Sequence, residues 1–162
     1  MPTTSPADPA AAEKTAVFAA FTAMWTEQGK AFRQADVKGT QLEKYATLRA
    51  LGEIRIGATR MKQAGTVMRG ELRAEDTTVT ALDLSAKTPK TPKTPKTPKT
   101  PKTPKTPKAT LTTCVDLSAY ETYNTRTNKP VPLPSNQPRR YVSTVLAEKW
   151  PNGWMVTDWS GE

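Results

Sequence analysis

Residues 141–159 read YVSTVLAEKWPNGWMVTDW, and this stretch decides the fold class. From Tyr141 to Lys149 the side chains alternate, with Val142, Thr144 and Leu146 on one face of a predicted strand and the residues between them on the other. Asn152-Gly153 follows, which is a strong signal for a tight hairpin turn. Residues 154–159 then return as the last strand, so the stretch predicts an antiparallel hairpin.

Three more strands are predicted upstream of this hairpin. The period of the pattern changes to two after Thr66. Residues 67–73 and 77–84 are expected to be strands that meet at a turn over 74–76, and residues 110–116, rich in Thr, Val and Leu, are the third strand. Residues 118–140 follow, and four prolines in their second half, 129–140, predict an irregular loop or a short polyproline segment there.

The first part of the chain predicts helices. Val17, Phe21, Trp25 and Phe32 share one helical face, which predicts a helix over 13–35. A second helix is expected over 41–57 and a short third one over 58–64, punctuated by glycines.

Residues 1–12, rich in Pro, Ala, Ser and Thr, predict a flexible leader without the features of a signal peptide. Helices followed by antiparallel strands predict a single α+β domain over 13–162, with the helices packed on one face of the sheet.

A low-complexity tract interrupts this domain at residues 87–108, which consist of Lys-Thr-Pro triplets and a closing lysine. Proline at every third position favours polyproline II and excludes a helix or central strand, so we expect a disordered loop. The tract distorts the net charge, because removing its eight lysines leaves 16 basic residues against 15 acidic ones and reduces +9 to +1. These lysines are Lys87, Lys90, Lys93, Lys96, Lys99, Lys102, Lys105 and Lys108.

Composition excludes several kinds of chemistry. The chain has no histidine and one cysteine, Cys114, so a Ser-His pair, an intrachain disulfide and a thiolate metal cluster are excluded. No metal or cofactor is expected, because neither a metal signature nor a phosphate-binding glycine loop is present. No stretch has the run of about 20 apolar residues that spans a bilayer.

The order of these elements resembles a group of small, mostly uncharacterised actinobacterial secreted proteins and lipoproteins with an NTF2-like (cystatin-like) cone fold. The resemblance is carried by AFTAMW at 20–25, ATLTTCVD at 109–116, PRRYV at 138–142 and GWMVTDW at 153–159. It implies three N-terminal helices over a bent antiparallel sheet, a pocket at the open end of the cone, a cell-envelope or secreted location and a plausible homodimer. The chain departs from the group in lacking an export segment, which as written implies a cytoplasmic location, and in carrying the tract.

Members of this superfamily include enzymes and non-catalytic binding modules, so the fold leaves the function open. Phe21, Trp25 and Tyr45 are the predicted pocket residues. An isomerase, hydrolase or cyclase would need a carboxylate with a raised pKa opposite a hydrogen-bond donor. Asp116 and Asp158 are the candidate carboxylates, and Tyr45, Tyr120 and Tyr123 could supply donors, with Asp116 and Tyr45 first. The alternative is that both aspartates sit at strand ends and face water.

We therefore expect a non-catalytic binding or interaction module, with an enzyme that uses the cone pocket as the alternative. The tract either has no role of its own, or tethers the protein to an anionic surface or polymer, or is modified at its Thr-Pro sites. A third reading of the whole protein is a nucleic-acid binder without sequence specificity, because no aromatic residue interrupts the tract.

Overall fold

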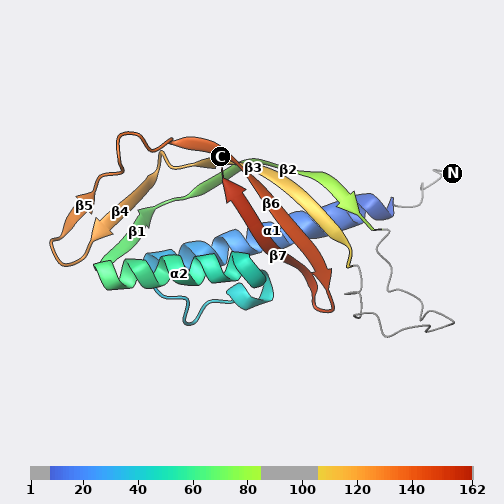
Figure 1. The fold of residues 1–162 in the computed structure, drawn as a ribbon, viewed down its shortest axis with the longest axis horizontal. Helices are drawn as coiled ribbons and strands as arrows, with labels where there is room; N and C mark the ends of the chain where they lie inside the picture. Colours follow the sequence, from blue (N-terminus) through green and yellow to red (C-terminus); the bar gives the residue numbers. More distant parts are fainter. Residues whose placement is uncertain (1–7, 85–105, 162) are drawn as a thin grey trace, which may run out of the picture.

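The computed structural model describes residues 8–84 and 106–161, and it shows an α+β fold (Figure 1). The helical elements come first in the chain, as predicted: α1 (Pro9–Gln34), the 3₁₀ helix η1 (Leu42–Lys44) and α2 (Leu48–Ala64). Seven strands follow: β1 (Thr66–Gly70), β2 (Arg73–Asp83), β3 (Lys108–Asp116), β4 (Tyr120–Asn124), β5 (Lys129–Val131), β6 (Arg140–Trp150) and β7 (Gly153–Gly161).

Helix α1 begins four residues earlier than the apolar stripe predicts. Pro9 occupies the first turn, where its missing N–H costs nothing, and the Asp8 carboxylate accepts a hydrogen bond from the N–H of Ala10 at 3.0 Å. Residues 9–12, assigned to a leader by composition, are therefore helical, and the rest of that leader up to residue 7 lies outside the described residues.

The two helices predicted over 41–57 and 58–64 are wrong in their boundaries. The structure has the short η1 turn and then one continuous α2, so the described residues contain two α-helices where the resemblance implied three. Gly57 lies inside α2, where a β-carbon would be in ordinary contact with the Phe32 ring of α1, 3.4 Å away. The glycine that seemed to end a helix lies where the two helices pack.

The strands form a four-stranded antiparallel sheet in the order β2-β3-β6-β7 and a three-stranded one in the order β1-β4-β5. Both sheets contain parts of the same long ribbon. β1 pairs with β4 from Thr66↔Asn124 to Gly70↔Tyr120, and β2 pairs with β3 from Arg73↔Asp116 onward. The expected turn at 74–76 does not exist, because these residues lie inside β2.

The ribbon bends where β1 passes into β2 and β3 into β4. The N–H of Glu71 donates to the carbonyl of Ala119 at 2.9 Å across the bend. Gly70 has a left-handed φ of 73°, and a β-carbon there would lie 1.9 Å from the Ala119 oxygen. Only glycine allows this approach, so the bend of the predicted sheet depends on one residue.

Residues 118–140 contain two strands that the proline-rich sequence obscured. β4 and β5 form a hairpin around a turn in which the Asn124 side-chain oxygen accepts from the N–H groups of Arg126 and Thr127. Pro130 lies in β5, at the edge of the three-stranded sheet, where a missing N–H is tolerated. The prediction of an irregular loop over 129–140 was therefore wrong for Lys129–Val131, and β4 lies in a part of the segment that was given no structure.

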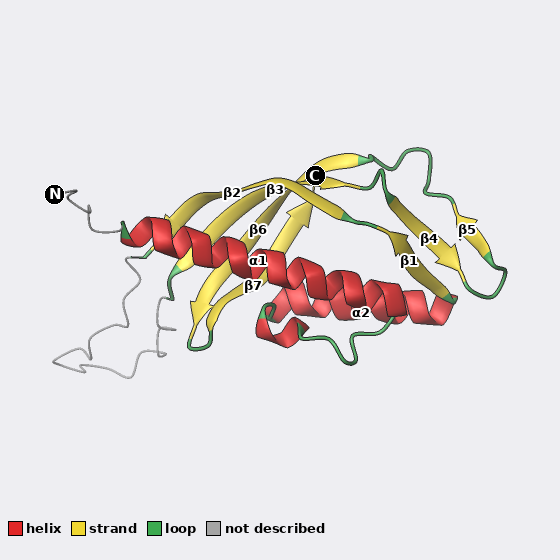
Figure 2. Ribbon diagram, turned by 180° about the vertical axis from the view of Figure 1, so that it is seen from behind, coloured by secondary structure: helices red, strands yellow, loops and turns green. Residues whose placement is uncertain are grey.

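The core lies between α1 and the inner face of the four-stranded sheet, and α2 runs beside the C-terminal half of α1 (Figure 2). On β6 the inward residues are Ser143, Val145 and Ala147, whereas Val142 and Leu146 are exposed. The alternating side chains of residues 141–149 therefore point to the inner and the outer face of the sheet in turn, as expected for an antiparallel sheet covered on one side.

The tract connects two paired strands, because Asp83 at the end of β2 lies opposite Lys108 at the start of β3. The carbonyl of Pro107 accepts from the N–H of Lys149 at 2.9 Å, so the last tract residues continue the sheet. The disordered loop predicted for the tract lies outside the described residues up to residue 105.

Candidate functional site

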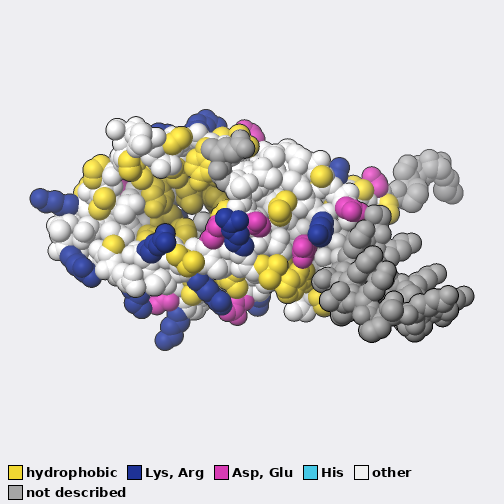
Figure 3. Space-filling view, viewed as in Figure 1, with side chains coloured by type: hydrophobic (Ala, Val, Ile, Leu, Met, Phe, Trp, Pro, Cys, Tyr) yellow, Lys and Arg dark blue, Asp and Glu magenta, His cyan; other side chains and the backbone are white. Residues whose placement is uncertain are grey.

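A cavity of about 250 Å³ lies between α1 and the bend of the ribbon. We call it the outer cavity, and Figure 3 shows that the molecule is hollowed between the three-stranded sheet and the helices, with hydrophobic side chains on the walls. Its lining residues come from α1, β1, the bend and the start of β2: Trp25, Thr26, Gln28, Gly29, Arg33, Met68, Glu71, Leu72 and Arg73.

A smaller space of about 80 Å³, the inner cavity, adjoins it on the core side. The two cavities share Trp25, Gln28 and Leu72. The remaining walls of the inner cavity are Phe21, Val115, Tyr141, Ser143, Val145 and Trp159. Burial raises the pKa of Tyr141, so this phenol stays neutral at physiological pH.

Trp25 is held in place between the cavities by a long-range contact. Its indole Nε1 donates to the backbone oxygen of Leu72 at 2.7 Å, and its ring lies 5.6 Å from the Phe21 ring, centroid to centroid. The Arg33 guanidinium donates to the carbonyl of Gly70 at 3.3 Å. Helix α1 thus holds the bend through two side chains, and the shape of the cavity depends on both.

Gln28 is the unusual residue of the site. Its side chain is buried, with 7% of the residue exposed, and its Oε1 is the one buried side-chain oxygen or nitrogen without a hydrogen-bond partner among the described residues. Leaving such a group unpaired costs about 1–3 kcal/mol, so native structures rarely tolerate it without a reason. The orphan acceptor belongs to a side chain that lines both cavities.

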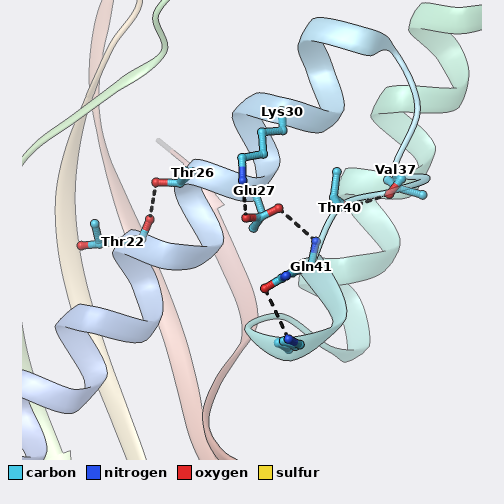
Figure 4. Close-up of polar contacts among 8 residues, drawn as sticks. Thr22, Thr26, Glu27, Lys30, Val37, Thr40 and Gln41 are labelled. Atoms are coloured by element: carbon cyan, nitrogen blue, oxygen red, sulfur yellow. Dashed lines mark hydrogen bonds and ion pairs between the residues drawn. The ribbon is translucent and has the colours of Figure 1, made fainter.

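Glu27, the residue before Gln28, is a buried polar side chain whose oxygens do have hydrogen-bond partners (Figure 4). Glu27 is also 7% exposed, but one carboxylate oxygen accepts from Lys30 Nζ at 2.8 Å and the other from the N–H of Gln41 at 3.0 Å. These contacts, the one from Gln41 first, lower the pKa of Glu27. The contrast shows that burial on α1 does not by itself deprive a polar group of partners.

Charged groups line the outer cavity on the solvent side. Arg73 Nε lies 3.3 Å from Glu71 Oε2, and both side chains are more than half exposed. Arg33 has no carboxylate partner among the described residues and donates to a backbone carbonyl. Two guanidinium groups against one carboxylate leave this rim with a net charge of +1.

The structure brings Phe21 and Trp25 together, as predicted for the pocket, but it separates Tyr45 from them. Tyr45 lines another groove of about 770 Å³ with Trp150 and Met155 at the β6–β7 turn. Tyr45 therefore lines neither of the cavities beside Trp25.

The candidate carboxylates do not have the properties that proton transfer needs. Asp116 is buried at the end of β3, but hydrogen bonds from the side chain and backbone of Ser118 lower its pKa, whereas a general acid needs a raised one. Asp158 is partly exposed, with Oδ1 at 3.6 Å from Arg49 Nε. Neither aspartate nor Tyr45 lines the outer or inner cavity.

Of the eight tract lysines, Lys108 is the one inside the described residues, where it is exposed at the start of β3. Over residues 8–84 and 106–161, no group of three or more His, Cys, Asp or Glu side chains is placed to hold a metal ion. No helix in those ranges combines the length and the apolar character that crossing a membrane requires.

Sequence reasoning missed Gln28, although a signal was present. The apolar stripe of α1 has steps of four from Val17 to Phe21 and Trp25, and then a step of seven to Phe32. The position skipped one turn after Trp25 falls at Gln28, so the stripe contains a polar residue on its buried face. A polar residue on a core-facing stripe is a reason to look for its partner.

Comparisons with known proteins support the fold and leave the function open. No protein-family model and no curated protein matches the chain. Among solved structures, the chain is similar to a crystal structure of the intermembrane space region of the chloroplast protein ARC6, with 16% identity and a TM-score of 0.56. The match covers 97% of this chain and 98% of the other. At this identity the likeness concerns the fold alone.

Proposed function

We propose that the protein is a non-catalytic binding module that takes a small, largely apolar ligand into the outer cavity. The observation that carries the proposal is the partnerless Oε1 of Gln28, a buried side chain that lines both cavities. Ligand sites typically combine mainly apolar walls with a few convergent polar groups, and volumes run upward from about 300 Å³. At about 250 Å³ the outer cavity lies just below that range, which is why we propose a small ligand.

The expected chemistry follows from the walls. Trp25, Met68 and Leu72 offer apolar contact, and Trp25 Nε1 is already occupied by Leu72, so the indole contributes its ring and not its donor. Gln28 Oε1 offers an acceptor in a place that water reaches poorly. A ligand with a hydroxyl or amine donor would satisfy it, and the gain is large because the acceptor is otherwise unpaired.

The experiment compares variants that fill the site with variants that do not. A β-carbon at Gly29 would meet Arg33 and Met68 at ordinary distances of 3.5 and 3.9 Å, so Gly29→Ala should fold and bind normally. Gly29→Leu should fill the outer cavity and abolish binding of hydroxyl-bearing aromatic fragments, followed by NMR shifts of the Trp25 indole and the Gln28 amide. Unchanged binding by Gly29→Leu would contradict the proposal, as would a bound water on Gln28 with no fragment binding.

The enzyme alternative is less well supported by the residues available. It requires a base within reach of the bound molecule, and the lowered pKa of Asp116 leaves its carboxylate a weak base at neutral pH. Loss of a measured activity in Asp116→Asn, with fragment binding intact, would favour the enzyme.

A second proposal concerns the tract, which we propose contacts anionic surfaces or polymers. Its support is the concentration of eight lysines in 22 residues of a chain that is otherwise close to neutral. Replacing the tract lysines by glutamine should abolish retention on heparin and on anionic vesicles at low salt. Retention that is unchanged would contradict the tether. Location at the cell envelope and a homodimer stay predictions from the resemblance.

A further inference from the structure

From the charges around the outer cavity we infer the class of ligand: a small amphipathic carboxylate that carries a hydroxyl or amine donor. This inference rests on the proposed function and adds the chemistry of both ends of the ligand. The inner end is set by Gln28 and the aromatic walls, and the outer end is set by Arg33, Arg73 and Glu71.

The inner end calls for an apolar group with one donor. Phe21, Trp25 and Trp159 line the inner cavity, and its small volume of about 80 Å³ admits part of a ligand and not a whole one. Gln28 lines both cavities, so a donor at the boundary between them would reach Oε1 once the amide turns, because that oxygen has almost no solvent-accessible surface in this structure. The rest of the ligand then lies in the outer cavity, toward the charged rim.

The rim favours an anion at this outer end. Arg33 and Arg73 both line the outer cavity, and guanidinium groups bind carboxylates through paired N–H donors. The Nη2 of Arg33 is within 3.3 Å of the Gly70 oxygen, which leaves its other donors for a ligand, and no carboxylate of the described residues neutralises its charge. Glu71 already neutralises Arg73 in part, so it competes with the ligand for that guanidinium.

Three surface substitutions separate these roles. Arg73→Gln removes one positive charge and should weaken the binding of a carboxylate without affecting its neutral analogue. Arg33→Gln removes another charge but also the contact with the Gly70 carbonyl, so its effect is read from the ratio of carboxylate to amide affinity. Glu71→Gln removes the competing carboxylate and should strengthen carboxylate binding. Because Glu71→Gln should change the carboxylate affinity in the opposite direction, general damage to the site would not explain the three results together.

The test uses three aromatic probes of nearly equal size: para-hydroxyphenylacetate, its primary amide, and phenylacetate. In the wild type we expect the carboxylate to bind about fivefold more tightly than the amide, the size of one or two exposed ion pairs. This preference should weaken at high salt and disappear in Arg33→Gln and Arg73→Gln. We expect para-hydroxyphenylacetate to bind about tenfold more tightly than phenylacetate, and Gln28→Met to remove that difference.

The outcomes distinguish this inference from the function on which it rests. If the amide binds as tightly as the carboxylate, and charge variants change nothing, the site binds neutral ligands and the inference is wrong while the proposed function stands. If no probe moves the NMR signals of Trp25 or Gln28 in the full chain, and the Gly29→Leu variant behaves like the wild type toward all of them, both fail. Unfolding curves of each variant confirm that the surface substitutions leave the fold intact.

Discussion

At the scale of single residues, the neighbours Glu27 and Gln28 differ in whether their buried side chains have hydrogen-bond partners. Both side chains are buried next to one another on α1, yet the carboxylate of Glu27 accepts hydrogen bonds from Lys30 and Gln41, and the Oε1 of Gln28 has no partner. The first residue holds the connection after α1 in place. The second leaves a buried acceptor unpaired, which costs stability.

Replacing Gln28 should therefore stabilise the protein. In Gln28→Met the unbranched side chain keeps the volume and removes the unpaired acceptor, so we expect the free energy of unfolding to rise by about 1 kcal/mol. Urea unfolding with an unchanged m-value measures this. Gln34→Met is the matched control on the same helix, because the Gln34 amide donates to the carbonyls of Asp36 and Lys38 at 2.6 Å and should lose stability. A destabilised Gln28→Met would show that the amide has a structural role.

Glu27 predicts a pH dependence of stability. Its folded pKa lies below the ordinary value of 4.5, so the unfolded state binds the proton more tightly. Its contribution is complete above that ordinary value and is lost as the pH falls through the lower, folded pKa. Glu27→Gln should lower the free energy of unfolding at neutral pH by about 1–2 kcal/mol, and the deficit should shrink in acid.

The comparison is with Glu53→Gln, which removes a more exposed carboxylate paired with Arg49 at 2.9 Å. Exposed pairs of this kind are worth up to about 0.5 kcal/mol, so this variant should behave almost like the wild type at every pH. Equal effects of the two substitutions would contradict a special role for Glu27.

At the scale of elements, the bent ribbon is the feature that makes room for the site. Gly70 permits the bend, and Trp25 and Arg33 of α1 hold it through the carbonyls of Leu72 and Gly70. A straight ribbon would continue β1 into β2 along the sheet and leave no space at the bend. The cavity is thus a consequence of how one pair of strands changes direction.

Gly70→Ala should lower the free energy of unfolding much more than Gly39→Ala, although both glycines have a left-handed φ. Gly39 has a similar left-handed φ of 81°, but nothing lies within 4 Å of a β-carbon there, so Gly39→Ala should cost about 1–2 kcal/mol. Gly70→Ala adds the clash with the Ala119 oxygen and should cost clearly more. Denaturant unfolding of both variants measures the difference, and equal costs would show that the bend adjusts freely.

At the scale of the whole molecule, we expect the tract and the fold to be separable. The tract leaves and re-enters between paired residues of neighbouring strands, Asp83 and Lys108. The sheet itself begins at the very end of the tract, because Pro107 and Lys108 pair with β6.

A short Gly-Ser connection in place of residues 87–105 should preserve the fold. Loop-closure cost changes by only about 0.6 kcal/mol for each doubling of length, so shortening should raise stability by about 1 kcal/mol. Thermal unfolding measures this, and fragment binding in the outer cavity should not change. A variant that also removes residues 106–108 is the contrasting control, since it loses the hydrogen bond to Lys149 and should be less stable. Unfolding of the first variant would contradict separability.

What was predictable from the sequence alone was local. Periodicity determined the α1 stripe, the β6–β7 hairpin and the α+β class, because a side chain's face follows from its position within a repeat. β4 and β5 were not predicted because they are held by pairing, β4 with β1 and β5 with β4, and not by an apolar alternation of their own. Gly57 was wrongly predicted to end a helix. Its role depends on packing against Phe32, which lies 25 positions earlier in the sequence and so leaves no local pattern.

The site itself was decided by tertiary structure. Trp25 and Leu72, whose hydrogen bond forms the wall between the cavities, are 47 residues apart, and the acceptor of Gln28 is an orphan only because of what surrounds it. No local pattern encodes a missing partner. The sequence by itself determined which faces are buried and where the charge lies, whereas the bend at Gly70 decided where the cavity beside the buried Gln28 side chain lies.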